Sequence, residues 1–155
     1  MLYKTHFVIS DFCISNVDIP EVIADRILLH HLIPMNIVQD ATPFDVYPSY
    51  SVKGQPSGWR PYFWEIARGR SGLSQHTFGQ RKKTIKDEKG GCDITCEDFE
   101  NNKDELLQAL IDNTDYIRFA VYKTFIHADY KNTHPGRRLL FDATGSRWKF
   151  KKFIE

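Results

Sequence analysis

Three widely separated side chains have the types that a catalytic metal site requires. They are His76, Asp93 and His127, which together supply two imidazoles and one carboxylate. Three nitrogen or oxygen ligands with a fourth position left to water are the set that catalytic zinc uses, and zinc then polarises a carbonyl and lowers the pKa of its water to ~7. Ligands on adjacent strands can converge on one ion because neighbouring strands lie about 4.8 Å apart. The three residues therefore predict a zinc hydrolase.

The elements that must position these residues are a mixture of helices and strands. Apolar residues at helical spacing predict a helix over 20–33, stopped by Pro34, and a second helix over 97–112. A short helix is expected at 61–67, and β-rich segments predict strands at 44–52, 94–95, 116–122 and 125–130, followed by a hairpin of 139–141 and 148–150. Because no βαβ rhythm is present, we expect an α+β fold with an antiparallel β-sheet and helices packed to one side.

The composition is that of a single globular domain spanning residues 1–155. Apolar residues make up 41% of the chain, and the net charge is +1, so no global field draws the protein to nucleic acid or to an anionic membrane. No segment has the apolar length of a membrane span, and the N-terminus lacks the features of a signal peptide. We therefore expect a cytoplasmic monomer with no nucleic-acid or membrane partner.

The three cysteines, Cys13, Cys92 and Cys96, do not form a disulfide framework, because their number is odd and no export signal is present. Cys92 and Cys96 could hold two corners of a structural zinc site, but the chain has no second cysteine pair. We expect buried, reduced thiols.

Several short motifs resemble one family when they are taken in order along the chain. The segment Ser74–Gly79 looks like the start of the S-x-H-x-x-G-x-A-x-D motif of zinc D-Ala-D-Ala carboxypeptidases and related peptidoglycan peptidases, and Gly91–Ile94 looks like its end. The later H-x-[HD] motif resembles Phe125–Asp129. The S-G-[FY]-R element resembles Ser57–Pro61, and the entry segment of phage and bacterial members resembles Phe7–Phe12 followed by Ser15. The resemblance spans about 7–130.

This resemblance implies the fold shared by hedgehog proteins and D,D-peptidases, an antiparallel sheet flanked by helices. It implies His76, Asp93 and His127 as zinc ligands, and Arg60 as the residue that grips the substrate or polarises its carbonyl. The implied substrate is a peptidoglycan stem peptide, cut by a D,D- or L,D-type carboxypeptidase or endopeptidase. A phage lysin released from the cytoplasm at lysis would explain how such an enzyme reaches the cell wall without an export signal.

The first departure from the family pattern is an insertion between the first histidine and the aspartate. About ten extra residues, roughly 81–90, stand there. If they project as a loop, the ligand geometry survives, because a longer loop adds little closure entropy. Otherwise Asp93 is the wrong carboxylate, and Asp87 or Glu88 replaces it.

The second departure concerns the general base. Many members of the family carry an acid three residues before the last histidine, where this chain has Thr124. Asp129 lies two residues after His127 and should share its strand face. We expect Asp129 to act as the base or to orient the water; the alternative is that it fixes the tautomer of His127. His134 is a further candidate, although it fits a polar turn better.

Two rival functions remain open at this stage. One is a catalytically inactive relative that binds zinc or wall peptide without cutting it, which the threonine at 124 favours. The other is a nucleic-acid module, suggested by the basic run 81–83 and by aromatic residues between cations at 147–152. The near-neutral charge opposes the second rival, and the 147–152 segment equally fits an edge strand protected by lysines.

Overall fold

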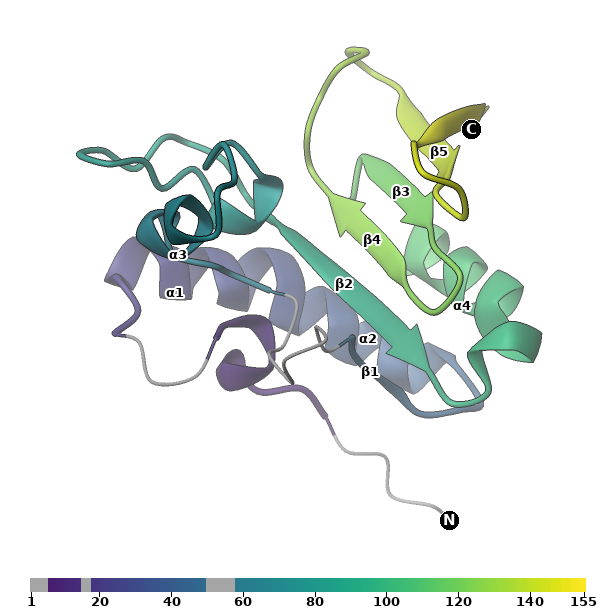
Figure 1. Cartoon of the computed structure of the whole chain (residues 1–155). Coiled ribbons are helices and arrows are strands. Elements are labelled where there is room, and N and C mark those ends of the chain that lie inside the picture. Colours follow the sequence, from purple (N-terminus) through teal and green to yellow (C-terminus); the bar gives the residue numbers. More distant parts are fainter. Residues whose placement is uncertain (1–5, 15–17, 50–57) are drawn as a thin grey trace.

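A computed structural model describes residues 6–14, 18–49 and 58–155. It is an α+β structure built on a six-stranded mixed sheet in the order β1-β2-β4-β3-β5-β6 (Figure 1). The strands are β1 Val46–Pro48, β2 Gly91–Cys96, β3 Arg118–Val121, β4 Ile126–Asp129, β5 Arg138–Asp142 and β6 Lys149–Ile154. The helices are η1 Ile9–Phe12, α1 Glu21–Ile27, η2 Leu28–Leu32, α2 Ile33–Ala41, α3 Tyr62–Ala67, η3 Gln75–Thr77 and α4 Phe99–Asn113. Three parts of the predicted features lie outside the described residues: residues 50–52 of the expected strand at 44–52, Ser57 of the Ser57–Pro61 element, and Ser15.

The prediction of an antiparallel sheet was wrong for one strand pair. Strands β3 and β5 are parallel, whereas every other pair in the sheet is antiparallel. After β4, the chain passes the start of β3 and enters β5 beside Arg118, so both strands run in the same direction. The Arg138 guanidinium fixes this crossing, because it donates to the carbonyls of Ile111, Thr114 and Tyr116. The expected hairpin of 139–141 and 148–150 is confirmed as β5 and β6.

The first long helix does not stop at Pro34, contrary to the prediction. It continues from α1 through a π-helical turn, η2, into α2, where Pro34 lies in the first turn. The π turn accommodates the ring, since the Ile33 N–H bonds to Leu28, five residues back. Proline leaves the carbonyl of His30 without its helical donor, and the Tyr130 hydroxyl donates to that oxygen at 2.7 Å. Tyr130, which directly follows β4, therefore supplies the hydrogen bond that proline removes from the helix.

The core lies between the sheet and the helices α1, α2 and α4, which Figure 1 shows behind the sheet. His31, in the π-helical turn η2, is completely buried in this core. Its two ring nitrogens pair with the Tyr116 hydroxyl and the Lys89 carbonyl, both at 2.8 Å. Burial lowers the pKa of His31 to about 3, so the ring is neutral at pH 7. None of the described helices has the length and apolar character needed to cross a bilayer.

Candidate metal site

The sheet register places two of the predicted ligands directly opposite each other. Asp93 on β2 pairs with His127 on β4, and two positions along, Gly91 pairs with Asp129. Residues two apart share a strand face, so Asp93, His127 and Asp129 all point away from the helices. On the other side of β4, Arg118 of β3 is the direct partner of Asp129. Local alternation in three strands thus brings one cation and three titratable groups to one face.

His76 reaches this face from the short helix η3. The Ser74 hydroxyl caps the helix by accepting from the His76 N–H at 3.2 Å. The segment before α3 then holds the residue on both sides: the Arg60 N–H donates to the His76 carbonyl at 2.7 Å, and His76 Nδ1 donates to the Gly58 carbonyl at 2.9 Å. Because Nδ1 is engaged, Nε2 faces Asp93.

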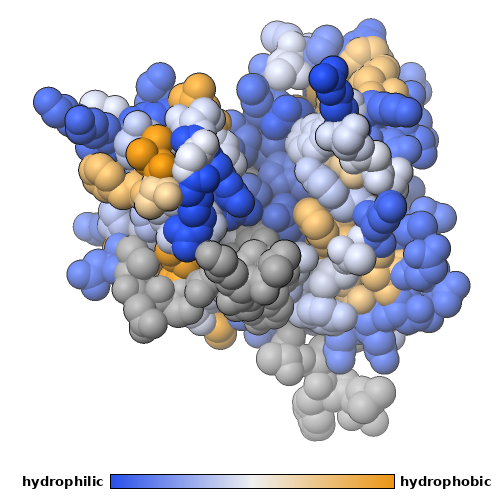
Figure 2. Space-filling view, in the orientation of Figure 1, coloured by the Kyte–Doolittle hydropathy of each residue, from blue (hydrophilic) through white to orange (hydrophobic). Residues whose placement is uncertain are grey.

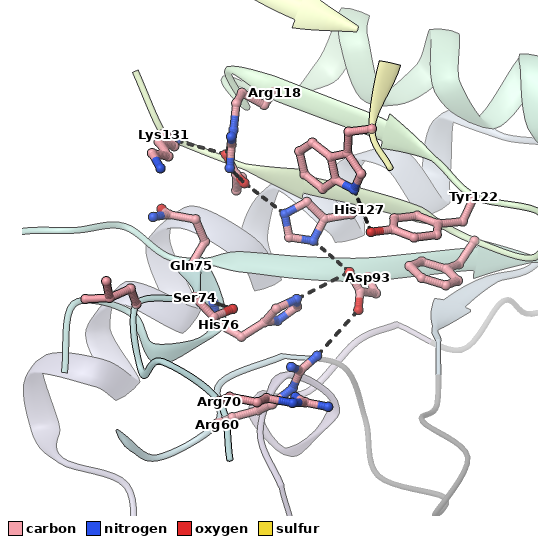
Figure 3. Close-up of a pocket in the computed structure, with 14 residues that line it drawn as sticks. Arg60, Arg70, Ser74, Gln75, His76, Asp93, Arg118, Tyr122, His127 and Lys131 are labelled. Atoms are coloured by element: carbon pink, nitrogen blue, oxygen red, sulfur yellow. Dashed lines mark hydrogen bonds and ion pairs between the residues drawn. The ribbon is translucent and has the colours of Figure 1, made fainter. Parts of the chain in front are cut away.

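The three predicted ligands form one buried group that could hold a metal ion. His76, Asp93 and His127 are 5, 6 and 7% exposed, and one ligand atom from each lies within 4.8 Å of the others. Asp93 Oδ1 is 3.4 Å from His76 Nε2 and 2.8 Å from His127 Nδ1 (Figure 3). Ligand atoms around a tetrahedral ion at about 2.1 Å lie about 3.4 Å apart, which is comparable with these two separations. The donor set therefore fits a divalent cation.

Both histidines also have the outer hydrogen bond that metal-binding histidines use. His76 donates to the Gly58 carbonyl, and His127 Nε2 donates to Asp129 Oδ2 at 2.8 Å. Such bonds select the tautomer and the ring orientation in metal sites. The inward nitrogens, Nε2 of His76 and Nδ1 of His127, are the ones that meet at Asp93.

The charges of the group are strongly coupled. Burial alone would lower the pKa of His127, but its hydrogen bonds to Asp129 and Asp93 raise it to about 9. Burial likewise opposes ionisation of Asp93, yet the two histidines hold the pKa of that carboxyl well below its usual range. Burial lowers the pKa of His76. The group therefore contains a stabilised anion at Asp93, which is the charge that a divalent cation needs.

Asp129 is enclosed by donors. It is completely buried, and its two oxygens accept four hydrogen bonds: from Nε and Nη2 of Arg118, from His127 Nε2 and from the Lys131 N–H. The Arg118 pairing is bidentate, the strongest form of this ion pair. Arg118 and His127 hold the pKa of the Asp129 carboxyl far below its usual range, although burial alone would raise it. The carboxylate has little freedom to accept a further proton.

The metal group lies at the floor of an open cavity of about 430 Å³. Figure 2 shows hydrophilic side chains in the hollow between the α3 side and the strand side of the molecule. On the α3 side, the buried Glu65 carboxylate binds both Arg60 and Arg70, with each guanidinium at 3.1 Å. Arg60 also reaches toward Asp93, with Nη2 3.8 Å from Oδ2. The predicted Arg60 therefore lies in the wall beside the metal group.

Aromatic side chains form the opposite wall. The Tyr122 ring stacks on Phe125, with centroids 4.3 Å apart, and its hydroxyl accepts from Trp148 Nε1 at 2.7 Å. Trp148 also packs against the His127 ring, with centroids 5.4 Å apart. The Tyr122 hydroxyl is held in place by the tryptophan, and its own proton remains available to a group in the cavity (Figure 3).

The other positions considered from the sequence, which include two carboxylates, a threonine and a histidine, lie away from the metal group. The Asp87 side chain is fully exposed, and Glu88 pairs with Arg81 at 3.1 Å. Thr124 is exposed and does not line the cavity. His134 is an exposed residue whose ring contacts Phe153. Asp93 is therefore the carboxylate that joins the two histidines.

The sequence interpretation missed several cavity residues, among them Arg118, Tyr122 and Trp148. Arg118 carried a usable signal, because it lies on the alternating face of β3, but its pairing with Asp129 depends on register. Tyr122 and Trp148 come from a strand end and from the loop before β6, and nothing in their local sequence marks them as cavity residues. The three cysteines are buried free thiols, as predicted.

Comparison with known proteins does not extend these observations. No protein-family model matches the chain, and neither the curated proteins nor the solved structures give a significant match.

Proposed function

We propose that the chain is a zinc-dependent peptidase that hydrolyses peptide bonds of bacterial peptidoglycan, with the hedgehog/D,D-peptidase fold. One observation carries the proposal: a buried His76–Asp93–His127 group, with its outer nitrogens engaged, at the floor of an open cavity. Two imidazoles and one carboxylate suit catalytic zinc. The short motifs that resemble zinc D-Ala-D-Ala carboxypeptidases support the choice of substrate. Zinc held by these residues would supply Lewis acidity and an activated water.

The residues of the chain have distinct tasks in this proposal. His76, Asp93 and His127 bind the ion, and Asp129 fixes the tautomer of His127. Arg60 binds the substrate's carbonyl or carboxylate oxygen, for which its planar fork is suited. Glu65 holds Arg60 in place at 3.1 Å.

Asp129 acts as a positioning residue in this proposal, in preference to the general base that its place on the strand face of His127 predicted. The Asp129 carboxylate is the acceptor in all four of its hydrogen bonds. The ion pair with Arg118 also favours the ionised form of the carboxylate. The Tyr122 hydroxyl, whose oxygen accepts from Trp148, donates a hydrogen bond to the oxygen of the scissile carbonyl as negative charge develops there, and it keeps its proton.

The second candidate is a non-catalytic protein that binds a metal ion or wall peptide. It is favoured by the cavity's lining: of the described residues there, the carboxylates are Asp93 and Asp129, and both are fully engaged. An enzyme of this class needs a proton acceptor, and neither carboxylate is free for that task.

Incubation of zinc-loaded protein with purified peptidoglycan separates the two candidates. The peptidase releases new amino groups and shortened muropeptides, which are detected by amine labelling and mass spectrometry. His76→Ala and a chelator should abolish the release, whereas His134→Ala, a change at an exposed histidine, should not. Binding of muropeptides without any new amine would establish the non-catalytic candidate and refute hydrolysis.

A further inference from the structure

A second cavity adjoins the metal site. Its volume is about 420 Å³, close to the 430 Å³ of the first, and the two share Gln75 and Lys131 as lining residues. Gln75 directly precedes the ligand His76 in the chain, and Lys131 follows Asp129 by two positions. The partition between the cavities is therefore built from the same segments that hold the metal group.

The outer wall of the second cavity is the insertion that separates this chain from the family pattern. Asp87, Glu88 and Lys89 line it. This loop is tied down at several points: Arg81 pairs with Glu88, and the Arg26 guanidinium donates to the carbonyls of Phe78 and Lys86. Figure 1 shows the loop as the teal segment that leaves the η3 region and returns to the start of β2.

A glycine makes the return of this loop possible. Gly79 has a φ of 78°, and a Cβ there would lie 2.3 Å from the Lys86 carbonyl oxygen. The Lys86 N–H donates to the Gly79 carbonyl at 2.8 Å. The Lys89 carbonyl, farther along, is bound by buried His31 at 2.8 Å. The second cavity therefore has a fixed wall, and its shape is a property of the fold.

Two polar side chains at the partition have no partner among the described residues. Four cations line the first cavity; Arg60 and Arg70 share Glu65, and Arg118 is paired with Asp129. The Lys131 ammonium has no acidic partner among the described residues. The Gln75 side-chain amide likewise makes no hydrogen bond within the described part of the chain. The Lys131 ammonium and the Gln75 amide, both labelled in Figure 3, thus belong to the two residues that line both cavities.

We propose that the two cavities form one substrate groove, so that the chain takes an extended peptide whose backbone continues past the metal group toward the insertion loop. The inference rests on the proposed peptidase function and deepens it, because it assigns the internal bond of a cross-linked peptide as the target. Gln75 pairs with a backbone amide of the substrate, for which its donor and acceptor are matched. Lys131 binds a substrate carboxylate beyond the scissile bond.

The test compares a cross-linked muropeptide dimer with the corresponding monomeric stem peptide. For zinc-loaded wild-type protein, kcat/KM for the dimer should exceed that for the monomer by at least about tenfold, and mass spectrometry should show cleavage at an internal bond. Loss of one hydrogen bond is worth up to about tenfold for a neutral pair, as at Gln75, and about tenfold or more for a charge-assisted pair, as at Lys131. Lys131→Ala and Gln75→Ala should each raise KM for the dimer by about that factor and leave the monomer within about twofold. Lys123→Ala, at an exposed lysine outside both cavities, is the control.

Failure of the peptidase proposal can be told apart from failure of the groove. If neither peptide is hydrolysed, the same peptides are titrated as ligands by calorimetry, and the dissociation constants replace KM. Tighter binding of the dimer that is lost in Lys131→Ala supports the groove even then. The groove is refuted if dimer and monomer are hydrolysed or bound equally well, or if neither peptide binds. It is also refuted if only a terminal residue is cleaved, or if both variants behave like wild type.

Discussion

The substitution Asp129→Asn preserves the shape of a buried side chain and removes its charge. The carboxylate accepts from four donors, two at each oxygen: Arg118 Nε and the Lys131 N–H at Oδ1, Arg118 Nη2 and His127 Nε2 at Oδ2. An asparagine has one oxygen and one amide group, so in either orientation two donors face an NH₂. The change therefore breaks about half of the network whichever way the amide turns.

The expected cost follows from those two unsatisfied donors. Each buried donor without an acceptor costs about 1–3 kcal/mol, and Arg118 is partly accessible to water, so we expect a loss of about 2–4 kcal/mol in the free energy of unfolding. When the amide faces His127, the ring no longer has the acceptor that fixes its tautomer. Loss of such an outer partner weakens metal binding by roughly 10- to 100-fold.

Chelator competition measures the zinc affinity, and urea denaturation of the metal-free protein measures the stability. Asp142→Asn is the matched control, because Asp142 accepts from Thr144 at an exposed strand end. It should leave the zinc affinity unchanged. A variant Asp129→Asn that loses turnover but keeps wild-type zinc affinity would refute the positioning role and reinstate Asp129 as the base.

Three further predictions concern other parts of the structure. Gly58→Ala places a Cβ 2.1 Å from the Phe12 carbonyl oxygen and should prevent folding, whereas Gly145→Ala meets nothing within 4 Å and should be neutral by thermal denaturation. Tyr122→Phe should lower kcat about 100-fold with KM little changed, which steady-state kinetics would contradict if kcat stayed at the wild-type value. Because the pKa of His31 falls from 6.5 to about 3 on folding, its neutral form stabilises the fold above pH 6.5. That stability should decline by up to about 1.4 kcal/mol per pH unit between pH 6.5 and 3, and His31→Gln should flatten the slope in denaturation series.

The proximity of His76, Asp93 and His127 could be predicted from the sequence, because local rules govern part of the arrangement. His127 and Asp129 lie two apart on a strand, which fixes their common face. Asp93 lies in a short strand that was expected at 94–95 and found at Gly91–Cys96. The insertion did not disturb this arrangement, because it leaves and returns beside η3.

Features that depend on distant partners were not accessible. Pro34 was expected to end a helix, and the donor that replaces its missing hydrogen bond is Tyr130, 100 residues beyond the His30 carbonyl. The parallel pairing of β5 with β3 depends on a crossing that Arg138 secures through backbone carbonyls of another element. Neither contact has a signature in the local sequence.

The roles of side chains within the cavity could not be predicted from the sequence either. The alternation of β4 places Asp129 beside His127, but only the register with β3 reveals that Arg118 engages both of its oxygens. A second cavity behind the insertion could not be foreseen from a polar, charged stretch of sequence. Pairwise contacts between strands and loops therefore decide which chemistry the cavity can perform.

Zinc content is the most direct measurement of the central claim. The protein is stripped with a chelator, reloaded with zinc, freed of unbound metal and analysed by atomic spectrometry. Wild type and the exposed-site variant His134→Ala should retain one ion per chain, and His76→Ala and Asp93→Ala should retain almost none. A wild-type chain that holds no zinc, or a His76→Ala variant that holds as much as wild type, would contradict the assignment.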